Sequence, residues 1–189
     1  MAKRTPKEIL HRVMRIARLD GWSIAVFAGL CALVSLAFGD LVGCIVGLIV
    51  AAGGVVEIRG LRRLQQHDAD GGMTLLIRAQ LIVLGSIWAY ALGKLFSFDP
   101  QTAMGNMTPD MKEMIDQVGL STAEINRLVS LTFYATYATV LVVTLIYQGG
   151  LALYYSRRRA TVREALTAPP DIPVTSRPRP TVGDDVMDN

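Results

Sequence analysis

Residues that could do acid–base chemistry or bind a metal together are found at one place in this sequence. The densest group is the run from Gln66 to Asp70, QHDAD, in which one histidine and two acids could bind a divalent cation. Adjacent polar residues directly before two glycines, Gly71 and Gly72, are more typical of a solvated turn. We therefore interpret this run as a turn between helices.

The long apolar segments hold no group of residues suited to catalysis. Catalysis would need paired carboxylates, a histidine or cysteine nucleophile system, or a metal cluster within reach of one another. Glu57 is expected at the cytoplasmic end of its helix, and no other acid is expected to lie deep. The sequence thus favours a protein that is not an enzyme, with no catalytic residue, no metal site and no cofactor.

A polar stripe does run along the last apolar segment. Its residues follow one another at steps of seven, four and seven, which places them on one face of a helix: Tyr137, Thr144, Gln148 and Tyr155. Such a stripe could line a path for a substrate or water. The alternative, which we favour, is that these groups form hydrogen bonds across helices or to another subunit.

The elements that must position these residues are membrane-spanning helices. Of the 189 residues, 51% are hydrophobic and 19% are charged, and the mean hydropathy is +0.37. Asp20 and Asp40 bracket 19 uncharged residues, and Arg127 and Arg157 bracket 29, enough to cross hydrocarbon about 30 Å thick. This composition favours an all-α integral membrane protein over a soluble domain.

The charge pattern predicts four transmembrane helices arranged as two hairpins. Their expected bounds are residues 21–39, 41–58, 73–98 and 128–156, with an outer loop over residues 99–127. Whether the first hairpin fully spans the membrane or is re-entrant stays open.

Local signals mark where these helices start and stop. The second helix is expected to continue beyond the bilayer until Gly71 and Gly72 stop it. A capping box, Ser121 with Glu124, starts the last helix, and Thr108 opens a short helix in the outer loop.

The two ends of the chain differ from the apolar middle. Residues 1–20 are expected to form a basic amphipathic helix that begins at a Thr5–Glu8 capping box and carries Arg12, Arg15 and Arg18 on its polar face. These arginines could bind anionic lipid headgroups, or the helix could pack against the rest of the protein. Residues 157–189 are basic and then proline-rich, a composition typical of a disordered tail.

Basic residues are most frequent at the two ends of the chain, which orients the protein. Six Lys or Arg residues precede the first helix and six follow the last. The positive-inside rule therefore predicts that both termini are cytoplasmic, and the compact loops favour a bacterial inner membrane. No basic stretch interleaves with aromatic residues, so a nucleic-acid partner is not expected.

Small residues recur at four-residue spacing in the first three apolar segments. The candidate packing positions are Gly43 and Gly47 in the second helix, and Gly85, Ala89 and Gly93 in the third. This spacing lets helix backbones approach closely. The leading expectation is a multi-pass protein that works by helix association, as a scaffold, accessory subunit or homo-oligomer, with the lipid bilayer and another membrane protein or itself as partners. The alternative is a small channel or transporter that uses the polar stripe.

Overall fold

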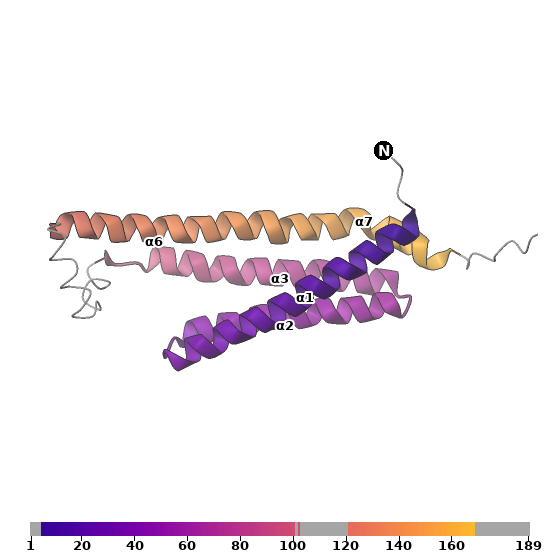
Figure 1. The fold of residues 1–189 in the computed structure, drawn as a ribbon, viewed down its shortest axis with the longest axis horizontal. Helices are drawn as coiled ribbons and strands as arrows, with labels where there is room; N and C mark the ends of the chain where they lie inside the picture. Colours follow the sequence, from indigo (N-terminus) through magenta and orange to yellow (C-terminus); the bar gives the residue numbers. More distant parts are fainter. Residues whose placement is uncertain (1–4, 101, 103–120, 169–189) are drawn as a thin grey trace, which may run out of the picture.

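The computed structural model describes residues 5–100, 102 and 121–168, and within these the chain folds into helices without strands. The helices are α1 (Pro6–Ala37), α2 (Leu41–Gln65), α3 (Ala69–Phe96), α6 (Thr122–Thr144), the π-helical turn η1 (Leu145–Gly149) and α7 (Gly150–Thr167). α6, η1 and α7 follow one another as one rod (Figure 1). The all-α class is confirmed.

Four helices are long and apolar enough to cross a membrane: α1, α2, α3 and the run Thr122–Thr167. Both described ends of the chain lie at one end of the bundle, together with the turn between α2 and α3 (Figure 1). We call this the terminal end. The opposite end, where α1 and α3 finish and α6 starts, is the loop end. The predicted short helix at Thr108 and the tail beyond residue 168 lie outside the described residues. The first part of the predicted tail, residues 157–167, is instead helical and belongs to α7, where Val162 and Ala165 are buried.

α1 is a single helix, whereas the sequence predicted an interfacial helix over residues 1–20 and a separate spanning helix from residue 21. The predicted capping box forms, with the Thr5 side chain and the Glu8 side chain each bound to the other's backbone N–H. The Asp20-Gly21 step does not break the helix, because Gly21 is packed against α2 and lies close to Ile58 and the Gly54 carbonyl. Tertiary packing has thus overridden the weak helix propensity of glycine.

The turn between α1 and α2 is three residues long. Gly39 has a φ of 74°, and the Asp40 carboxylate accepts a hydrogen bond of 2.9 Å from the Gly43 backbone N–H at the start of α2. This N–H holds the pKa of Asp40 below its ordinary value. The Tyr90 hydroxyl of α3 also donates to Asp40, at 3.4 Å, and so links the turn to the third helix.

The turn between α2 and α3 corrects one prediction. Gly71 and Gly72 were expected to stop the second helix, but α2 ends at Gln65 and both glycines lie in the first turn of α3. Asp68 caps α3 by accepting a 2.8 Å hydrogen bond from the Gly71 N–H, and His67 reverses the chain with a φ of 66°. Gly72 serves packing instead, since an added Cβ would lie 2.6 Å from Leu64 of α2.

The apolar core sits at the terminal end. Leu10, Val13 and Ala17 of α1 pack there against residues of α2, α3 and α7, including Met73 and Val162. The apolar face of the N-terminal region is therefore covered by protein. On the surface nearby, Asp70 of α3 accepts hydrogen bonds from two arginines of α7, Arg159 at 3.1 Å and Arg163.

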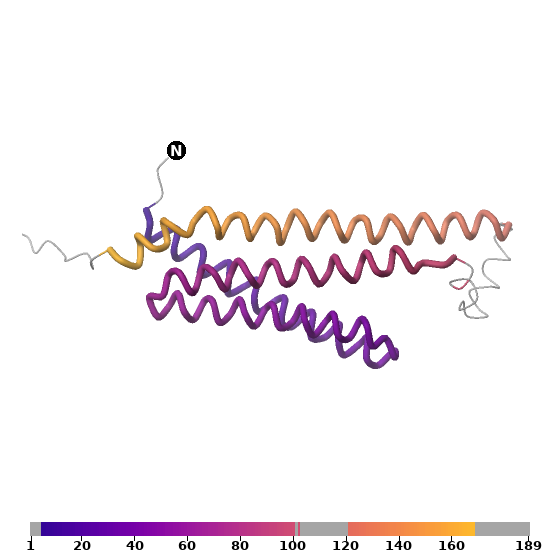
Figure 2. Tube along the Cα trace, turned by 180° about the vertical axis from the view of Figure 1, so that it is seen from behind, coloured from indigo at the N-terminus to yellow at the C-terminus, as the bar shows by residue number. Residues whose placement is uncertain are grey.

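The loop end is packed less completely. α1 and α2 lie side by side as a pair, and the α6–α7 rod runs along α3 (Figures 1 and 2). Ile125 is the one buried residue of α6, although this helix is 23 residues long. Toward the loop end α6 therefore packs mainly on α3 and leaves most of its circumference open.

Candidate functional site

Two acids, Asp20 of α1 and Glu57 of α2, are buried in the interior of the bundle. Asp20 is 4% exposed and Glu57 is 0% exposed. Each lies on the face of its helix that carries the buried small and apolar residues, Val13 and Ala17 for α1 and Gly53 and Gly54 for α2. Helical spacing on those faces thus turns both carboxylates inward rather than toward the surface.

Asp20 is hydrogen-bonded through both carboxylate oxygens. Gln80 of α3 donates from Nε2 to one oxygen at 2.8 Å, and the Tyr147 hydroxyl of η1 donates to the other at 2.8 Å. Three helical elements that are far apart in the sequence therefore meet at this one side chain.

Glu57 is hydrogen-bonded on one oxygen only. The hydroxyl of Tyr155 in α7, itself 0% exposed, donates to Oε1 at 2.9 Å. The other oxygen, Oε2, is buried and has no hydrogen-bond partner. The amide oxygens of Gln80 and Gln148 are likewise buried and without a donor. We refer to Asp20, Glu57, Gln80, Tyr147 and Tyr155 as the acidic cluster.

The π turn η1 lies where the α6–α7 rod contacts the acidic cluster. A π turn holds more residues per turn than an α-helix, so it shifts the face on which later residues lie. Tyr147 and Gln148 are both within η1, and Tyr155 follows two turns later in α7. The turn occurs where the rod supplies hydrogen-bond donors to acids on two other helices.

Two buried acids without a basic partner could bind a cation or a proton. No Lys or Arg among the described residues forms an ion pair with Asp20 or Glu57. Within the described residues there is also no group of three or more His, Cys, Asp or Glu side chains suited to a metal ion. The cluster offers only oxygen ligands, which suit a hard, small cation.

The predicted polar stripe is divided between two environments. Toward the terminal end, Tyr155 and Gln148 are buried, and Tyr155 belongs to the acidic cluster. Thr144 bonds to its own helix, with Oγ1 donating to the Val140 carbonyl at 2.6 Å. Tyr137, toward the loop end, packs against Phe133 with ring centroids 4.6 Å apart.

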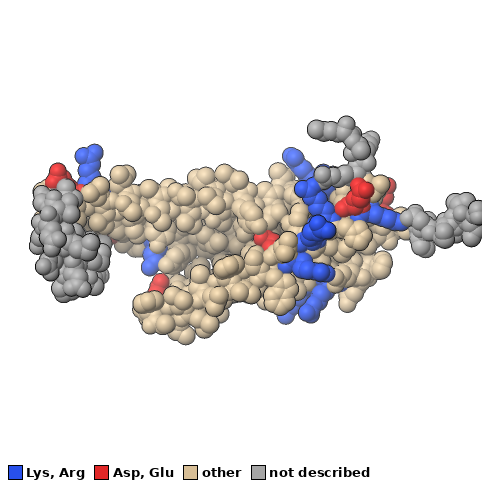
Figure 3. All heavy atoms as spheres, in the orientation of Figure 1, with Lys and Arg blue, Asp and Glu red and all other residues tan. Residues whose placement is uncertain are grey.

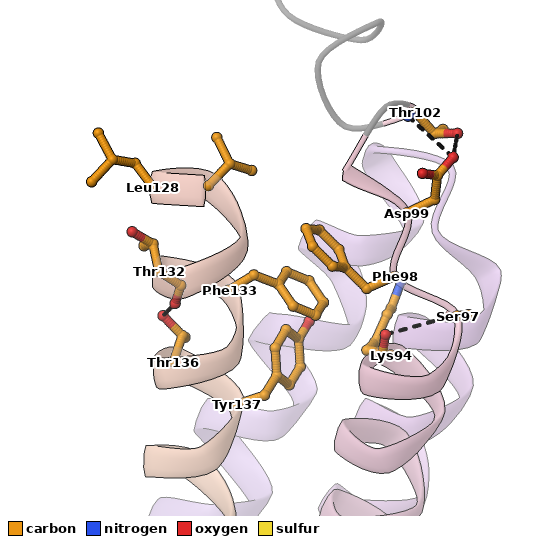
Figure 4. A pocket seen from close by; sticks show the side chains of 11 residues that line it. Lys94, Ser97, Phe98, Asp99, Thr102, Leu128, Thr132, Phe133, Thr136 and Tyr137 are labelled. Carbon is orange, nitrogen blue, oxygen red and sulfur yellow. Dashed lines mark hydrogen bonds between the residues drawn. The ribbon is translucent and has the colours of Figure 1, made fainter. Parts of the chain in front are cut away.

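A cavity of about 750 Å³ lies at the loop end between α3 and α6, and Tyr137 lines it (Figure 4). The rings of Phe98 and Phe133, stacked at 3.8 Å, stand between the two helices there. None of the residues that line this cavity belongs to the acidic cluster. The stripe is therefore not lined by one continuous opening.

The packing candidates occupy two kinds of surface. Gly47 lies in the contact between α1 and α2, where an added Cβ would be 2.9 Å from Ala32, and Gly43 lies beside Asp40 and Ser35. In contrast, Gly85 and Gly93 have nothing within 4 Å of an added Cβ. Ala89, between them on α3, is exposed.

Arg12, Arg15 and Arg18 are all exposed along one side of α1. Arg15 and Arg18 line a cavity of about 740 Å³ at the terminal end, together with His11, His67 and the apolar side chains of Leu10, Met14, Leu19, Leu64 and Leu166. A basic rim around apolar walls is compatible with a lipid headgroup and its acyl chain.

Sequence reasoning missed the pairing of Asp20 with Glu57. Asp20 was used only as the boundary of an apolar run, and Glu57 was placed at a helix end. The available signal was spacing: Val13, Ala17 and Asp20 follow at i, i+4 and i+7, which puts an acid in the middle of an apolar face. Comparison with protein-family models, with curated proteins and with solved structures finds no match.

Proposed function

We propose that the protein resides in a bacterial inner membrane with both termini in the cytoplasm. Four helices of sufficient length and apolarity support this placement. In the space-filling view, Lys and Arg side chains gather toward the terminal end and uncharged surface covers the middle of the molecule (Figure 3). Basic residues at the end that carries both termini fit the positive-inside rule.

Cysteine labelling tests this orientation on the two short turns. Phe38 is 85% exposed at the turn between α1 and α2, and Gln66 is exposed at the turn between α2 and α3. Each would be replaced by cysteine in a chain whose Cys31 and Cys44 have been changed to serine. An impermeant thiol reagent applied to intact cells should label Phe38→Cys and spare Gln66→Cys. The reverse pattern would overturn the orientation.

We further propose that the protein works by self-association through helix packing rather than by catalysis. The observation that carries this proposal is the row Gly85, Ala89 and Gly93, which lies open on the surface of α3. Within the chain, small residues already allow close helix packing, since Gly47 and Gly54 let the backbones of α1 and α2 approach each other. A row of the same kind without a partner in its own chain can pack on the same row of a second copy about a two-fold axis.

The incomplete packing of α6 supports the same proposal. Its exposed side has a groove of about 570 Å³ lined by Leu131 and Val140 together with the smaller residues Thr132, Ala135, Thr136 and Thr139. The hydroxyls of Thr136 and Thr139 bond to carbonyls four residues earlier at 2.8 Å, so they bring no unsatisfied group into a helix contact. A second copy would cover surface that one chain leaves open.

The test compares two identical substitutions at exposed alanines. Ala89→Ile adds bulk in the middle of the α3 row, and Ala52→Ile adds the same bulk on the exposed side of α2. The oligomeric mass in mild detergent, measured by light scattering, should fall for Ala89→Ile and remain that of the wild type for Ala52→Ile. In the cysteine-free background, Ala89→Cys should form a disulfide-linked dimer in native membranes. A monomeric wild type, or equal behaviour of the two isoleucine variants, would refute self-association.

A small channel or transporter is the second candidate, and the acidic cluster favours it. Ionisable residues inside a membrane commonly mark ion pathways, and Tyr155 of the polar stripe donates a hydrogen bond to one such residue, Glu57. Flux of protons or Na⁺ into proteoliposomes would decide in its favour, provided that Glu57→Gln abolishes the flux.

A further inference from the structure

The acidic cluster has more buried hydrogen-bond acceptors than donors. Its donor atoms all bond to the two acids, because Gln80 Nε2 and the Tyr147 hydroxyl bond to Asp20 and the Tyr155 hydroxyl bonds to Glu57. Only the second Nε2 hydrogen of Gln80 is left. Glu57 Oε2 and Gln80 Oε1 are two buried acceptors of the cluster without a donor. A buried acceptor without a donor is costly, so the cluster lacks at least one hydrogen.

The charge of the acidic cluster also favours an added proton. Two ionised carboxylates in the interior, with no basic partner among the described residues, would place two negative charges in a region of low dielectric constant, which is strongly unfavourable. The groups that face the pair are uncharged at neutral pH: Gln80 from α3, Tyr147 from η1 and Tyr155 from α7. One added positive charge lowers the net charge of the pair from −2 to −1.

We propose that the acidic cluster is a proton-binding site, in which one exchangeable proton resides on Glu57 Oε2. Asp20 is the carboxylate of the pair, since both of its oxygens accept hydrogen bonds. Glu57 is the acid, since only its Oε1 accepts one. The proton makes Glu57 a hydrogen-bond donor, and the acceptor within its reach is the Asp20 carboxylate.

A proton fits this site better than a metal ion does. A proton needs no cavity, whereas a bound ion needs a space lined by its ligands, and neither the loop-end cavity nor the terminal-end cavity is lined by Asp20, Glu57 or Gln80. The described residues also offer no group of three acidic, histidine or cysteine ligands. Na⁺ remains the competing occupant that the experiment must distinguish.

Loss of this proton would act on the whole bundle. The acidic cluster joins α1, α2 and α3 to η1 and α7, and its hydrogen bonds cross 60, 127 and 98 positions of the sequence. Deprotonation would leave two facing negative charges at the centre of these contacts. The site therefore makes the packing of the rod against the other helices dependent on pH.

Infrared spectroscopy on the purified full chain in detergent tests whether the proton is present. The wild type at neutral pH should show the carbonyl band of a buried protonated carboxyl group, which shifts in D₂O. The band should be absent in Glu57→Gln and retained in Glu164→Gln, which alters an exposed acid of α7. A wild type without the band, or a band retained in Glu57→Gln, would overturn the proposal.

Equilibrium unfolding as a function of pH gives an independent measurement. The folded chain holds one proton that the unfolded chain, with its acids in water, releases, so the unfolding constant should rise about tenfold per pH unit above neutrality until the site is empty. Glu57→Gln should abolish this slope and Glu164→Gln should keep it. If Glu57→Gln does not fold, the presence or absence of the wild-type slope decides. A flat wild-type profile would overturn the proposal, and stabilisation by NaCl over choline chloride without a pH slope would show a metal-ion site instead.

Discussion

Gly54 lies at the closest approach of α1 and α2, so its replacement by alanine should destabilise the fold. A Cβ added at Gly54 would be 2.7 Å from the Ala25 backbone nitrogen and 2.7 Å from the Gly21 carbonyl oxygen. Both contacts are with backbone, which cannot rotate away, so the helices must separate. Overpacking of this kind costs about 1–3 kcal/mol, whereas replacing a helical glycine with alanine gains about 1 kcal/mol of helix propensity. Since the contacts involve two backbone atoms, we expect the upper part of that cost and a net loss of about 1–2 kcal/mol.

Gly29→Ala is the matched control, because Gly29 also lies inside a helix but has nothing within 4 Å of an added Cβ. At about 2–4 °C per kcal/mol for a chain of this size, Gly54→Ala should lower Tm by about 2–8 °C. Gly29→Ala should leave Tm unchanged or raise it slightly. Both would be measured by thermal unfolding in one detergent at equal protein concentration. If Gly54→Ala were as stable as Gly29→Ala, the close contact between α1 and α2 would be refuted.

Three further substitutions test the core, the acidic cluster and the first turn. Leu76→Ala, at a side chain 0% exposed, should cost about 2–5 kcal/mol in chemical unfolding, whereas Leu81→Ala, 53% exposed on the same helix, should change stability by no more than about 0.5 kcal/mol. Tyr155→Phe removes the donor to Glu57 Oε1 and should cost about 1–3 kcal/mol, while Tyr154→Phe should be near neutral; equal losses would contradict the hydrogen bond. Asp40→Ala should lower Tm more than Asp40→Asn, because asparagine can still cap α2. Because the pKa of Asp40 is lowered in the folded state, its charge stabilises the fold above the ordinary pKa of aspartate, and that contribution is lost as the pH falls through the lowered value. The Tm advantage of the wild type over Asp40→Asn should therefore shrink on acidification.

The four apolar helices could be predicted because apolar length is a local property of the sequence. A run such as residues 21–39 shows its class without knowledge of its neighbours. The capping boxes at Thr5 and Ser121 were equally local, and both form. The end of α2 was misjudged because two glycines suggest a helix stop, whereas Asp68 caps the next helix three residues before Gly71.

The acidic cluster could not be assembled from the sequence because it depends on contacts between distant residues. Asp20 and Tyr147 are 127 positions apart, and neither local sequence predicts a contact with the other. The π turn is similar, since the residues Leu145–Gly149 include no proline, and the glycine at their end recurs at many regular positions of these helices. Spacing could have placed Asp20 on an apolar face, but only the fold identifies Glu57 as its neighbour.

The close contact between α1 and α2 lies at the same level of the bundle as the acidic cluster. Gly21 follows Asp20 directly, and Gly54 precedes Glu57 by three residues, so the two glycines meet where the two acids are brought together. An added Cβ at Gly21 would in fact lie 3.4 Å from the Glu57 Cβ. Close backbone approach therefore holds two carboxylates at a separation that charge repulsion would oppose if both were ionised. The proton on Glu57 and the glycines at the contact are thus two parts of one arrangement: the glycines allow the approach, and the proton lets the acids tolerate it.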